Sequence, residues 1–168
     1  MAQAAVLTIS DSRSGGQAKD ESGPAACEAL EWMGFAVSER RVIPDEGEQI
    51  ARAVRELAGS VDLIVTTGGT GVGPRDVTPE AVRPLFDREL PGFGEIMRTG
   101  SFAKTPLSII SRGGAGVSGK TLIVMLPGSP KGVRECLELI GPAIKHVMKI
   151  LSSDAVGDAH PTDCQNPA

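Results

Sequence analysis

The sequence predicts one α/β domain of three layers, in which a mostly parallel sheet is covered by helices on both faces. Three observations support this prediction. Strand-like segments alternate with amphipathic helical segments, several of the strand-like segments are apolar, and short polar loops separate the two kinds. Repeated strand–helix units form parallel sheets that are buried on both sides. Late in the chain two strand-like segments follow each other without a helix, so one antiparallel strand is expected near an edge.

The first unit is a strand over residues 4–9, a polar loop over residues 10–16, and a helix that starts near residues 20–22. Pro24 falls in the first turn of this helix, where a missing N–H costs little, and Gly34 ends it. Its inward positions keep helical spacing and are Ala26, Ala29, Leu30 and Met33.

A second strand is expected over residues 35–42 and a third over residues 61–66. The amphipathic helix between them is indicated by the apolar positions Ile50, Ala53, Val54 and Leu57. After a glycine-rich loop, helical pieces are expected near residues 79–87 and 93–100, separated by Pro91-Gly92.

The last elements are two strands and a long helix. Residues 107–111 and 120–126 read as strands, joined by a hairpin or short excursion at the glycines of residues 113–116. The final helix begins at Pro130. Its apolar face consists of Val133, Cys136, Leu137, Ile140, Ile144, Val147, Met148 and Leu151. The domain is thus predicted to span residues 1–151, and the polar residues 152–168 are predicted to be a disordered tail.

Composition excludes several functional classes. The 168 residues suffice for one domain, and the net charge of -4 with no tyrosine argues against a nucleic-acid surface. No apolar run approaches the roughly 20 residues of a membrane span. The three cysteines show no metal-ligand spacing, and an odd number favours reduced thiols. A cytoplasmic enzyme without a membrane or nucleic-acid partner is the leading prediction.

The most informative segment is the glycine loop of residues 65–80, where a buried strand runs into small residues and then into a new helix. Its glycines allow a ligand to approach the backbone, because no Cβ blocks the amides. Arg75 and Asp76 follow at once. This order is typical of a phosphate site with a carboxylate beside it. The Walker and dinucleotide-binding patterns are both absent, since the glycine spacing differs and no Gly-Lys-Ser/Thr follows.

Four strand-ending loops carry the candidate residues: residues 10–12, residues 42–46, the glycine loop, and residues 126–131. If their strands run in parallel, the loops meet at one edge of the sheet. Backbone amides, the helix that Ser129 caps, and Lys131 would then face a polyanion from several sides.

Two carboxylates bear on whether the site only binds a phosphate ligand or also catalyses a reaction. Asp45 and Asp76 each follow a strand, and carboxylates beside a phosphate pocket are explained by a bridging Mg²⁺, which also serves phosphoryl or nucleotidyl transfer. Both carboxylates also have alternative structural roles. Asp45 with Glu48 is also a capping box, and Asp76 could form an ion pair with Arg75 or a loop hydrogen bond.

The remaining candidates have plain structural alternatives. Ser10 and Asp11 could bind a ligand, but Ser-Asp after a strand is also ordinary turn chemistry. Arg112, after Ser111, either grips phosphate or forms a surface ion pair. Cys136 continues an apolar stripe, which favours core packing over nucleophilic work.

Taken together, the glycine loop and the other blocks resemble the Mog/MoaB molybdopterin adenylyltransferase family, to which the G domain of gephyrin also belongs. The matching blocks are residues 7–11, 43–46, 67–71, 75–80, 91–95 and 126–131, in order within about residues 4–150.

The resemblance implies a molybdopterin-binding-like fold that assembles as a homotrimer, in some members as a hexamer. The implied reaction adenylylates molybdopterin with Mg-ATP and releases pyrophosphate, before a molybdate-insertion protein acts downstream. Asp45 and Asp76 match the acidic catalytic positions and would hold Mg²⁺. The substrate-binding residues that the resemblance implies are Ser10, Asp11, Thr67, Gly68, Gly69, Thr70, Gly71, Ser111, Arg112, Pro127, Gly128, Ser129 and Lys131.

Two alternatives stay open. The chain could be a non-catalytic molybdopterin carrier of the same fold, or a related domain of a different enzyme, such as the molybdate-insertion protein. The presence of both acidic residues favours the catalytic reading.

Overall fold

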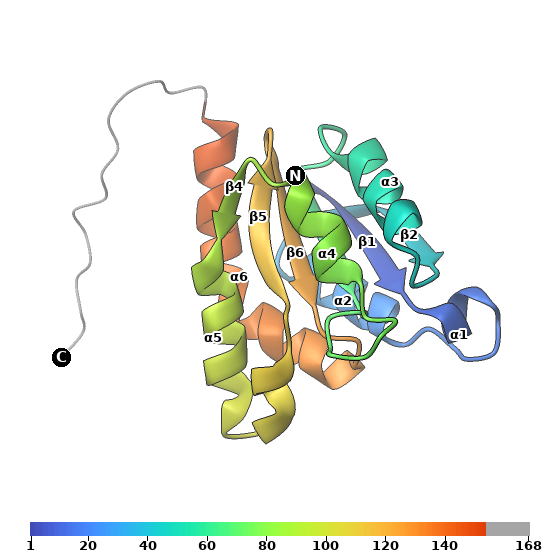
Figure 1. Ribbon diagram of the computed structural model, residues 1–168. Helices are drawn as coiled ribbons and strands as arrows, with labels where there is room; N and C mark the ends of the chain where they lie inside the picture. The colour runs from blue at the N-terminus through green and yellow to red at the C-terminus, as the bar shows by residue number, and fades with distance from the viewer. Residues whose placement is uncertain (154–168) are drawn as a thin grey trace.

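The computed structural model describes residues 1–153 as one six-stranded sheet with helices on both faces (Figure 1). The strands are β1 (Gln3–Ile9), β2 (Ala36–Ile43), β3 (Leu63–Thr67), β4 (Arg88–Leu90), β5 (Gly114–Ser118) and β6 (Thr121–Leu126). The α-helices are α1 (Asp11–Ser14), α2 (Ser22–Trp32), α3 (Gly47–Leu57), α4 (Thr78–Val82), α5 (Pro91–Phe102) and α6 (Pro130–Ser152). Two 3-10 helices are η1 (Arg83–Leu85) and η2 (Pro106–Ile110).

The strand order is β2-β1-β3-β6-β5-β4. The pairs β1–β2, β1–β3 and β3–β6 are parallel, whereas β5 is antiparallel to both of its neighbours, β6 and β4. The predicted single antiparallel strand near an edge is therefore confirmed as β5. The four strands β1, β2, β3 and β6 all direct their carboxyl ends to the same edge of the sheet.

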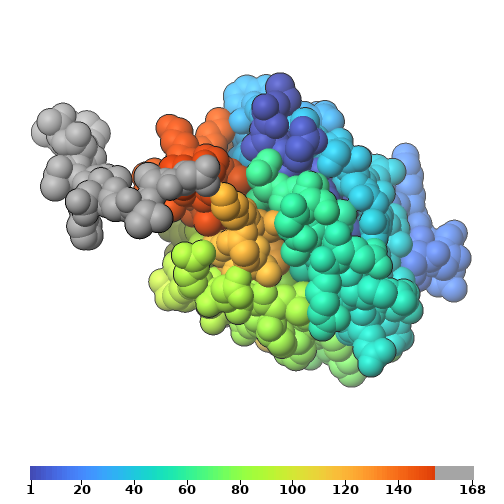
Figure 2. All heavy atoms as spheres, turned by 90° about the horizontal axis from the view of Figure 1, so that it is seen from above, coloured from blue at the N-terminus to red at the C-terminus, as the bar shows by residue number. Residues whose placement is uncertain are grey.

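Two apolar clusters cover the two faces of the sheet. Alternate residues of β1 belong to different clusters: Ala4 and Val6 pack with α2, α5 and α6, while Ala5, Leu7 and Ile9 pack with α3 and α4. This explains why β1 is apolar without interruption, since both of its faces are buried. Seen from above in Figure 2, the orange β5–β6 turn lies between the red end of α6 and the teal residues of α3.

The structure corrects the prediction for residues 106–118. The expected strand at 107–111 is the 3-10 helix η2, and the expected glycine turn at 113–116 lies largely within β5. Close packing explains why these glycines form a strand. A Cβ on Gly116 would lie 2.3 Å from the Phe86 ring, and one on Gly113 would lie 2.5 Å from the Met125 carbonyl oxygen.

Three shorter elements also differ from the prediction. The loop after β1 contains the single-turn helix α1, with Ser10 as its N-cap. The helix expected over residues 79–87 ends at Leu85 as η1, and the edge strand β4 then precedes Pro91, which begins α5 instead of separating two helices. Each segment is too short to show a clear period in the sequence.

The long C-terminal helix follows the predicted pattern. Val133, Cys136, Leu137, Ile140 and Ile144 are buried on its inner face, and the last residues of the apolar stripe are partly buried. Of the predicted tail, Ser152 ends α6 and Ser153 caps it, and residues 154–168 lie outside the described residues. Within residues 1–153, the helices are all too short or too polar to cross a membrane.

Removing a buried side chain from α6 tests this packing. Ile140 is 1% exposed and Ile150, on the same helix, is 57% exposed. We expect Ile140→Ala to lower the free energy of unfolding by about 2–5 kcal/mol, because it leaves a cavity between the helix and the sheet. Ile150→Ala is the matched control and is expected to change it by less than about 0.5 kcal/mol. Urea denaturation measures both, and equal effects would contradict the described packing.

Candidate functional site

Four loops meet at the carboxyl edge of the parallel strands, and hydrogen bonds join them. The Ser10 amide donates to the Ile43 carbonyl oxygen at 2.8 Å, which connects the loops after β1 and β2. The Gly68 amide donates to the Leu126 carbonyl oxygen at 3.2 Å, and the Thr67 hydroxyl donates to the Pro127 carbonyl oxygen at 2.7 Å. The loops after β3 and β6 are thereby joined as well.

The glycine loop leaves β3 through two residues with positive φ, Gly68 at 102° and Gly69 at 63°. A Cβ on Gly68 would lie 2.3 Å from the Ile9 carbonyl oxygen, and one on Gly69 would lie 2.3 Å from the Thr78 hydroxyl oxygen. Only glycine fits both the conformation and the space. Within the described residues, the amides of Gly69, Thr70 and Gly71 have no hydrogen-bond acceptor, so they are available to an anion.

Arg112 supports the glycine loop from behind. Its Nε donates to the Gly71 carbonyl oxygen and its Nη2 to the Asp76 carbonyl oxygen, both at 2.6 Å, while Nη1 forms an ion pair with Glu80. The Arg112 amide also donates to the Thr70 carbonyl oxygen at 2.8 Å. All three guanidinium nitrogens therefore bind protein groups, and Arg112 does not line the pocket described below.

Asp11 and Asp45 bind each other's backbone. The Asp11 amide donates to Asp45 Oδ2 at 2.8 Å, and the Asp45 amide donates to Asp11 Oδ1 at 2.9 Å. Arg75, from the glycine loop, donates to Asp11 at 3.0 Å and to Glu46 at 2.8 Å. Three loops are thus linked through charged groups. The helix α3 begins at Gly47 after the N-cap residue Glu46, which has no side-chain cap. The capping box considered as an alternative role for Asp45 and Glu48 therefore does not form.

The pKa values of the Asp11 and Asp45 carboxyl groups are shifted in opposite directions. The hydrogen bond from the Arg75 guanidinium lowers the pKa of the exposed Asp11 carboxyl. Burial raises the pKa of Asp45, and repulsion from the Asp11 and Asp76 charges adds to this effect. Asp45 is therefore a carboxylate whose ionised form is destabilised in the free protein.

Asp76 turns back onto its own loop. Its Oδ2 accepts a hydrogen bond from the Gly73 amide at 2.8 Å, and a Cβ on Gly71 would lie 2.8 Å from the same oxygen. The loop hydrogen bond considered for Asp76 is present, while Arg75 pairs with Asp11 and Glu46 instead. Asp76 Oδ1 has no hydrogen-bond partner within the described residues.

These carboxylates fit a Mg²⁺ ion that is shared with a phosphate ligand. Within residues 1–153, no three His, Cys, Asp or Glu side chains gather into a group that could hold a metal ion alone. Mg²⁺ is commonly bound by one or two carboxylates together with substrate phosphates. The repulsion between Asp45 and Asp76 is what such a cation would relieve.

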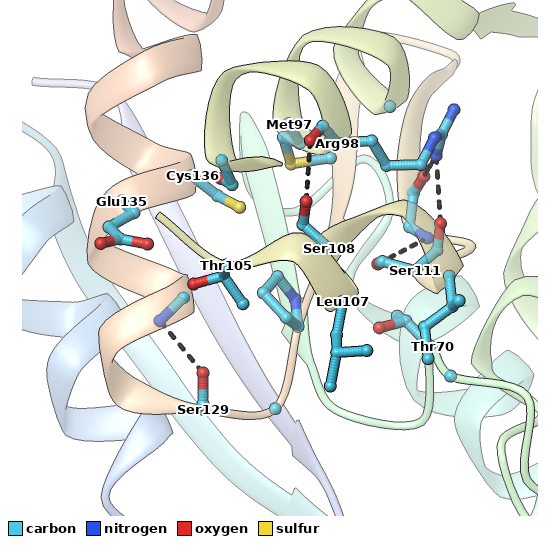
Figure 3. A pocket seen from close by; sticks show the side chains of 18 of the residues that line it. Thr70, Met97, Arg98, Thr105, Leu107, Ser108, Ser111, Ser129, Glu135 and Cys136 are labelled. Carbon is cyan, nitrogen blue, oxygen red and sulfur yellow. Dashed lines mark hydrogen bonds between the residues drawn. The ribbon is translucent and has the colours of Figure 1, made fainter. Parts of the chain in front are cut away.

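A pocket of about 540 Å³ opens beside the glycine loop, between α5, η2 and the start of α6 (Figure 3). The predicted site residues that line it are Gly69, Thr70, Gly71, Asp76, Ser111, Pro127, Gly128, Ser129 and Lys131. The predicted residues that do not line it are Ser10, Asp11, Asp45, Thr67, Gly68 and Arg112. The structure thus separates the predicted set into residues that line the pocket and residues that lie outside it.

The start of α6 forms one wall of the pocket. The Ser129 hydroxyl accepts a hydrogen bond from the Gly132 amide at 3.1 Å, so Ser129 caps the helix as predicted. The positive end of the helix dipole therefore faces the pocket. The exposed Lys131 lies in this first turn.

Sequence reasoning missed the opposite wall, which α5 and η2 provide. Its members are Gly94, Met97, Arg98, Ser101, Thr105, Leu107, Ser108 and Ile110. Arg98 holds this wall to the sheet by donating to the carbonyl oxygens of Ser111 at 3.3 Å and Gly113 at 3.1 Å. The helical period of α5 was the only available signal, and it does not show which strand edge the helix covers.

Comparison with known proteins matches residues 5–146 to the family model described as a probable molybdopterin binding domain. The chain is 41% identical over 150 residues to the molybdopterin adenylyltransferase of Helicobacter pylori, covering 87% of this chain and 85% of that protein. It is also 41% identical over 150 residues to the molybdopterin adenylyltransferase of Escherichia coli, covering 85% and 75%. The crystal structure of the molybdopterin biosynthesis enzyme MoaB from Thermus thermophilus superimposes with a TM-score of 0.85 at 45% identity, covering 90% of this chain and 97% of that one.

The opposite pKa shifts of Asp11 and Asp45 predict opposite effects of neutral substitutions on stability. Ionised Asp45 costs folding free energy above its raised folded pKa, so Asp45→Asn should raise the free energy of unfolding at pH 7. Ionised Asp11 stabilises the folded protein above its unfolded pKa of about 3.9, and this stabilisation is lost as pH falls through its lowered folded pKa. Asp11→Asn should therefore lower the free energy of unfolding at pH 7. Both effects should diminish toward pH 3. Urea denaturation at the two pH values checks the signs, and shifts of equal sign would refute the assignment.

The support from Arg112 can be tested with a substitution that keeps its charge. A single ammonium cannot replace three guanidinium donors. We therefore expect Arg112→Lys to lower the free energy of unfolding by about 1–3 kcal/mol and to speed amide hydrogen exchange in residues 70–76. Arg55→Lys, on the exposed side of α3, is the control. Unchanged exchange in the glycine loop would show that Arg112 does not support it.

Proposed function

The chain belongs to the family of the probable molybdopterin binding domain, and from this premise we propose that it acts in molybdenum cofactor biosynthesis as a nucleotidyltransferase, a molybdopterin adenylyltransferase. One observation supports catalysis: the carboxylates of Asp45 and Asp76 both lie against the glycine loop with its unpaired amides. A Cβ on Gly69 would lie 3.1 Å from Asp45 Oδ1, and a Cβ on Gly71 would lie 2.8 Å from Asp76 Oδ2. A surface that only bound an anion would gain nothing from two negative charges at that place.

In the proposed reaction, a terminal phosphate oxygen of molybdopterin attacks the α-phosphorus of ATP. A new O–P bond forms as the bond from that phosphorus to the bridging oxygen breaks, and the electron pair leaves with pyrophosphate. The products are adenylyl-molybdopterin and pyrophosphate. Such a transfer needs mainly the alignment of two phosphates and stabilisation of negative charge.

The residues of the pocket suit both tasks. The free amides of Gly69, Thr70 and Gly71 would bind phosphate oxygens, and the α6 N-terminus with Lys131 would face them from the other side. Arg112, behind the loop, would fix the direction of these amides rather than touch the substrate.

Asp45 and Asp76 would hold Mg²⁺, which when bound supplies Lewis-acid stabilisation of the phosphate oxygens. Ser10 and Asp11 would act through their position: Ser10 caps α1, and the Asp11 amide orients the Asp45 carboxylate. Asp11 in turn is held by Arg75.

We also propose that the chain assembles with copies of itself, as a homotrimer or hexamer, and passes its product to a molybdate-insertion protein in the cytoplasm. Apolar side chains exposed on α5 and η2 support self-association, because monomeric surfaces rarely expose such clusters. These residues are Ile96, Phe102, Leu107, Ile109 and Ile110.

The decisive experiment measures pyrophosphate release from molybdopterin and Mg-ATP by the unmodified protein and by Asp76→Asn. We expect the substitution to reduce the rate by about 100-fold or more, because it removes a metal ligand, while molybdopterin binding is largely kept. Asp62→Asn is the control, since Asp62 lies at the opposite end of β3 and the side-chain oxygen of the asparagine can still accept the hydrogen bond from the Gln3 backbone N–H. Unchanged turnover in Asp76→Asn would overturn its role, and no turnover by the unmodified protein would favour a non-catalytic carrier.

A further inference from the structure

One end of the pocket, between α5 and α6, has a chemistry that phosphate binding does not explain. Figure 3 shows Glu135 and Cys136 of α6 at this end, and Thr70 and Ser111 at the other. This end is lined by both polar and apolar side chains: Met97, Ser101, Thr105, Glu135 and Cys136. A carboxylate at this end would repel phosphate, so a different part of a substrate has to occupy it.

The Glu135 carboxylate is largely shielded from solvent and has few charged or polar partners. Its side chain is 16% exposed, and its one ion-pair partner within the described residues is Lys131, whose Nζ is 3.9 Å away and whose side chain is 71% exposed. No hydrogen-bond donor contacts it within residues 1–153. Since no donor contacts the two carboxylate oxygens, they are available to a ligand that brings N–H groups.

Ser101 provides a second, independent observation that points to a polar ligand at this end of the pocket. The residue is 5% exposed, lines the pocket, and its hydroxyl oxygen is buried without a hydrogen-bond partner. Its polar neighbour is the Cys136 thiol: burial raises the pKa of this thiol, and the Ser101 hydroxyl partly opposes that shift, but a thiol is a weak hydrogen-bonding group. Buried hydroxyls are normally paired, and an unpaired one in a pocket wall indicates a place for a polar ligand atom.

From these groups we propose that Glu135 is the specificity-determining residue that binds the 2-amino and N3–H edge of the pterin ring, with Ser101 paired to a polar atom of the same ring. This edge presents two adjacent N–H donors, which match the two oxygens of one carboxylate. The adenine of ATP has a donor beside a ring acceptor at the corresponding edge, so a carboxylate accepts only one of its hydrogen bonds and repels the other atom.

The rest of this end suits a flat heterocycle. No aromatic side chain is among the residues that line the pocket, and the Met97 thioether provides a polarisable surface for the ring instead. With the ring at Glu135, the phosphate end of the molecule extends toward the amides of the glycine loop and Asp76, at the other end of the same pocket. The inference rests on the proposed function in that it assigns molybdopterin as the substrate.

The test compares Glu135→Gln with Glu138→Gln, which removes a charge from an exposed residue of the same helix. Molybdopterin binding is measured by ultrafiltration with pterin fluorescence, and ATP binding by calorimetry. We expect Glu135→Gln to raise the Kd for molybdopterin about 10- to 100-fold and to leave the Kd for ATP within about twofold, because one carboxylate oxygen is replaced by a donor. Glu138→Gln should change neither. An unchanged Kd for molybdopterin, or an equal rise in the Kd for ATP, would overturn the proposal.

A matched pair of small molecules tests the edge directly. Pterin and lumazine differ at C2, which carries an amino group in the first and a carbonyl oxygen in the second. In the unmodified protein, pterin should displace molybdopterin about 10-fold more effectively than lumazine, and Glu135→Gln should abolish this preference. Pterin that displaces no better than lumazine would refute the assignment.

Ser101→Ala serves as the second variant if Glu135→Gln does not fold. Because its hydroxyl is unpaired in the free protein, we expect no loss of stability but weaker molybdopterin binding, and unchanged binding would count against the subsite. Pyrophosphate release by the unmodified protein separates the two claims. Turnover without a Glu135 effect refutes the subsite alone, whereas discrimination between pterin and lumazine without turnover refutes the adenylyltransferase alone.

Discussion

The close passage of the glycine loop between neighbouring strand ends is the constraint on which the rest of the site depends. At Gly68 a Cβ would lie 2.3 Å from the Ile9 carbonyl oxygen, and on the other side a Cβ on Gly128 would lie 3.3 Å from the Gly68 Cα. Three parallel strands can bring their ends this close only if the loops carry no side chains there. The same absence of side chains leaves room for an anion to approach the loop amides.

Arginines stabilise this arrangement mainly from outside the pocket. Arg112 binds the carbonyl oxygens of the glycine loop, and Arg75 ties Asp11 to Glu46. Their planar, multiply donating groups can hold several backbone and carboxylate oxygens at once, which a lysine cannot do. As a result Arg112 and Arg75 order the loops without lining the pocket, whose charged lining residues are Asp76, Arg98, Lys131 and Glu135. In the proposed function, Asp45 and Asp76 would then bind a cation that arrives with the phosphate.

The sequence was most informative where one rule governed several residues. Period and apolarity predicted the long α6 and the parallel strands, because burial on both faces imposes a simple pattern there. It failed at β5, where close packing against Phe86 selects glycine inside a strand, and local rules read glycine as a turn. It also failed at the wall formed by α5 and η2, since the approach of Ser101 to Cys136 and Glu135 depends on how two helices meet. No sequence spacing encodes that meeting.

The net charge of -4 sharpens the question of how this chain would bind two polyanions. Long-range attraction cannot serve, because an acidic protein repels phosphates at a distance and salt screens its field within about 10 Å. Attraction therefore has to be local, from amides, the α6 dipole and, in the proposed function, a metal ion that Asp45 and Asp76 would hold. Local binding of this kind does not separate one nucleotide-like anion from another. The proposed pairing of Glu135 with a pterin edge adds that discrimination at the far end of the pocket, where a carboxylate favours two adjacent N–H donors and disfavours a misplaced phosphate.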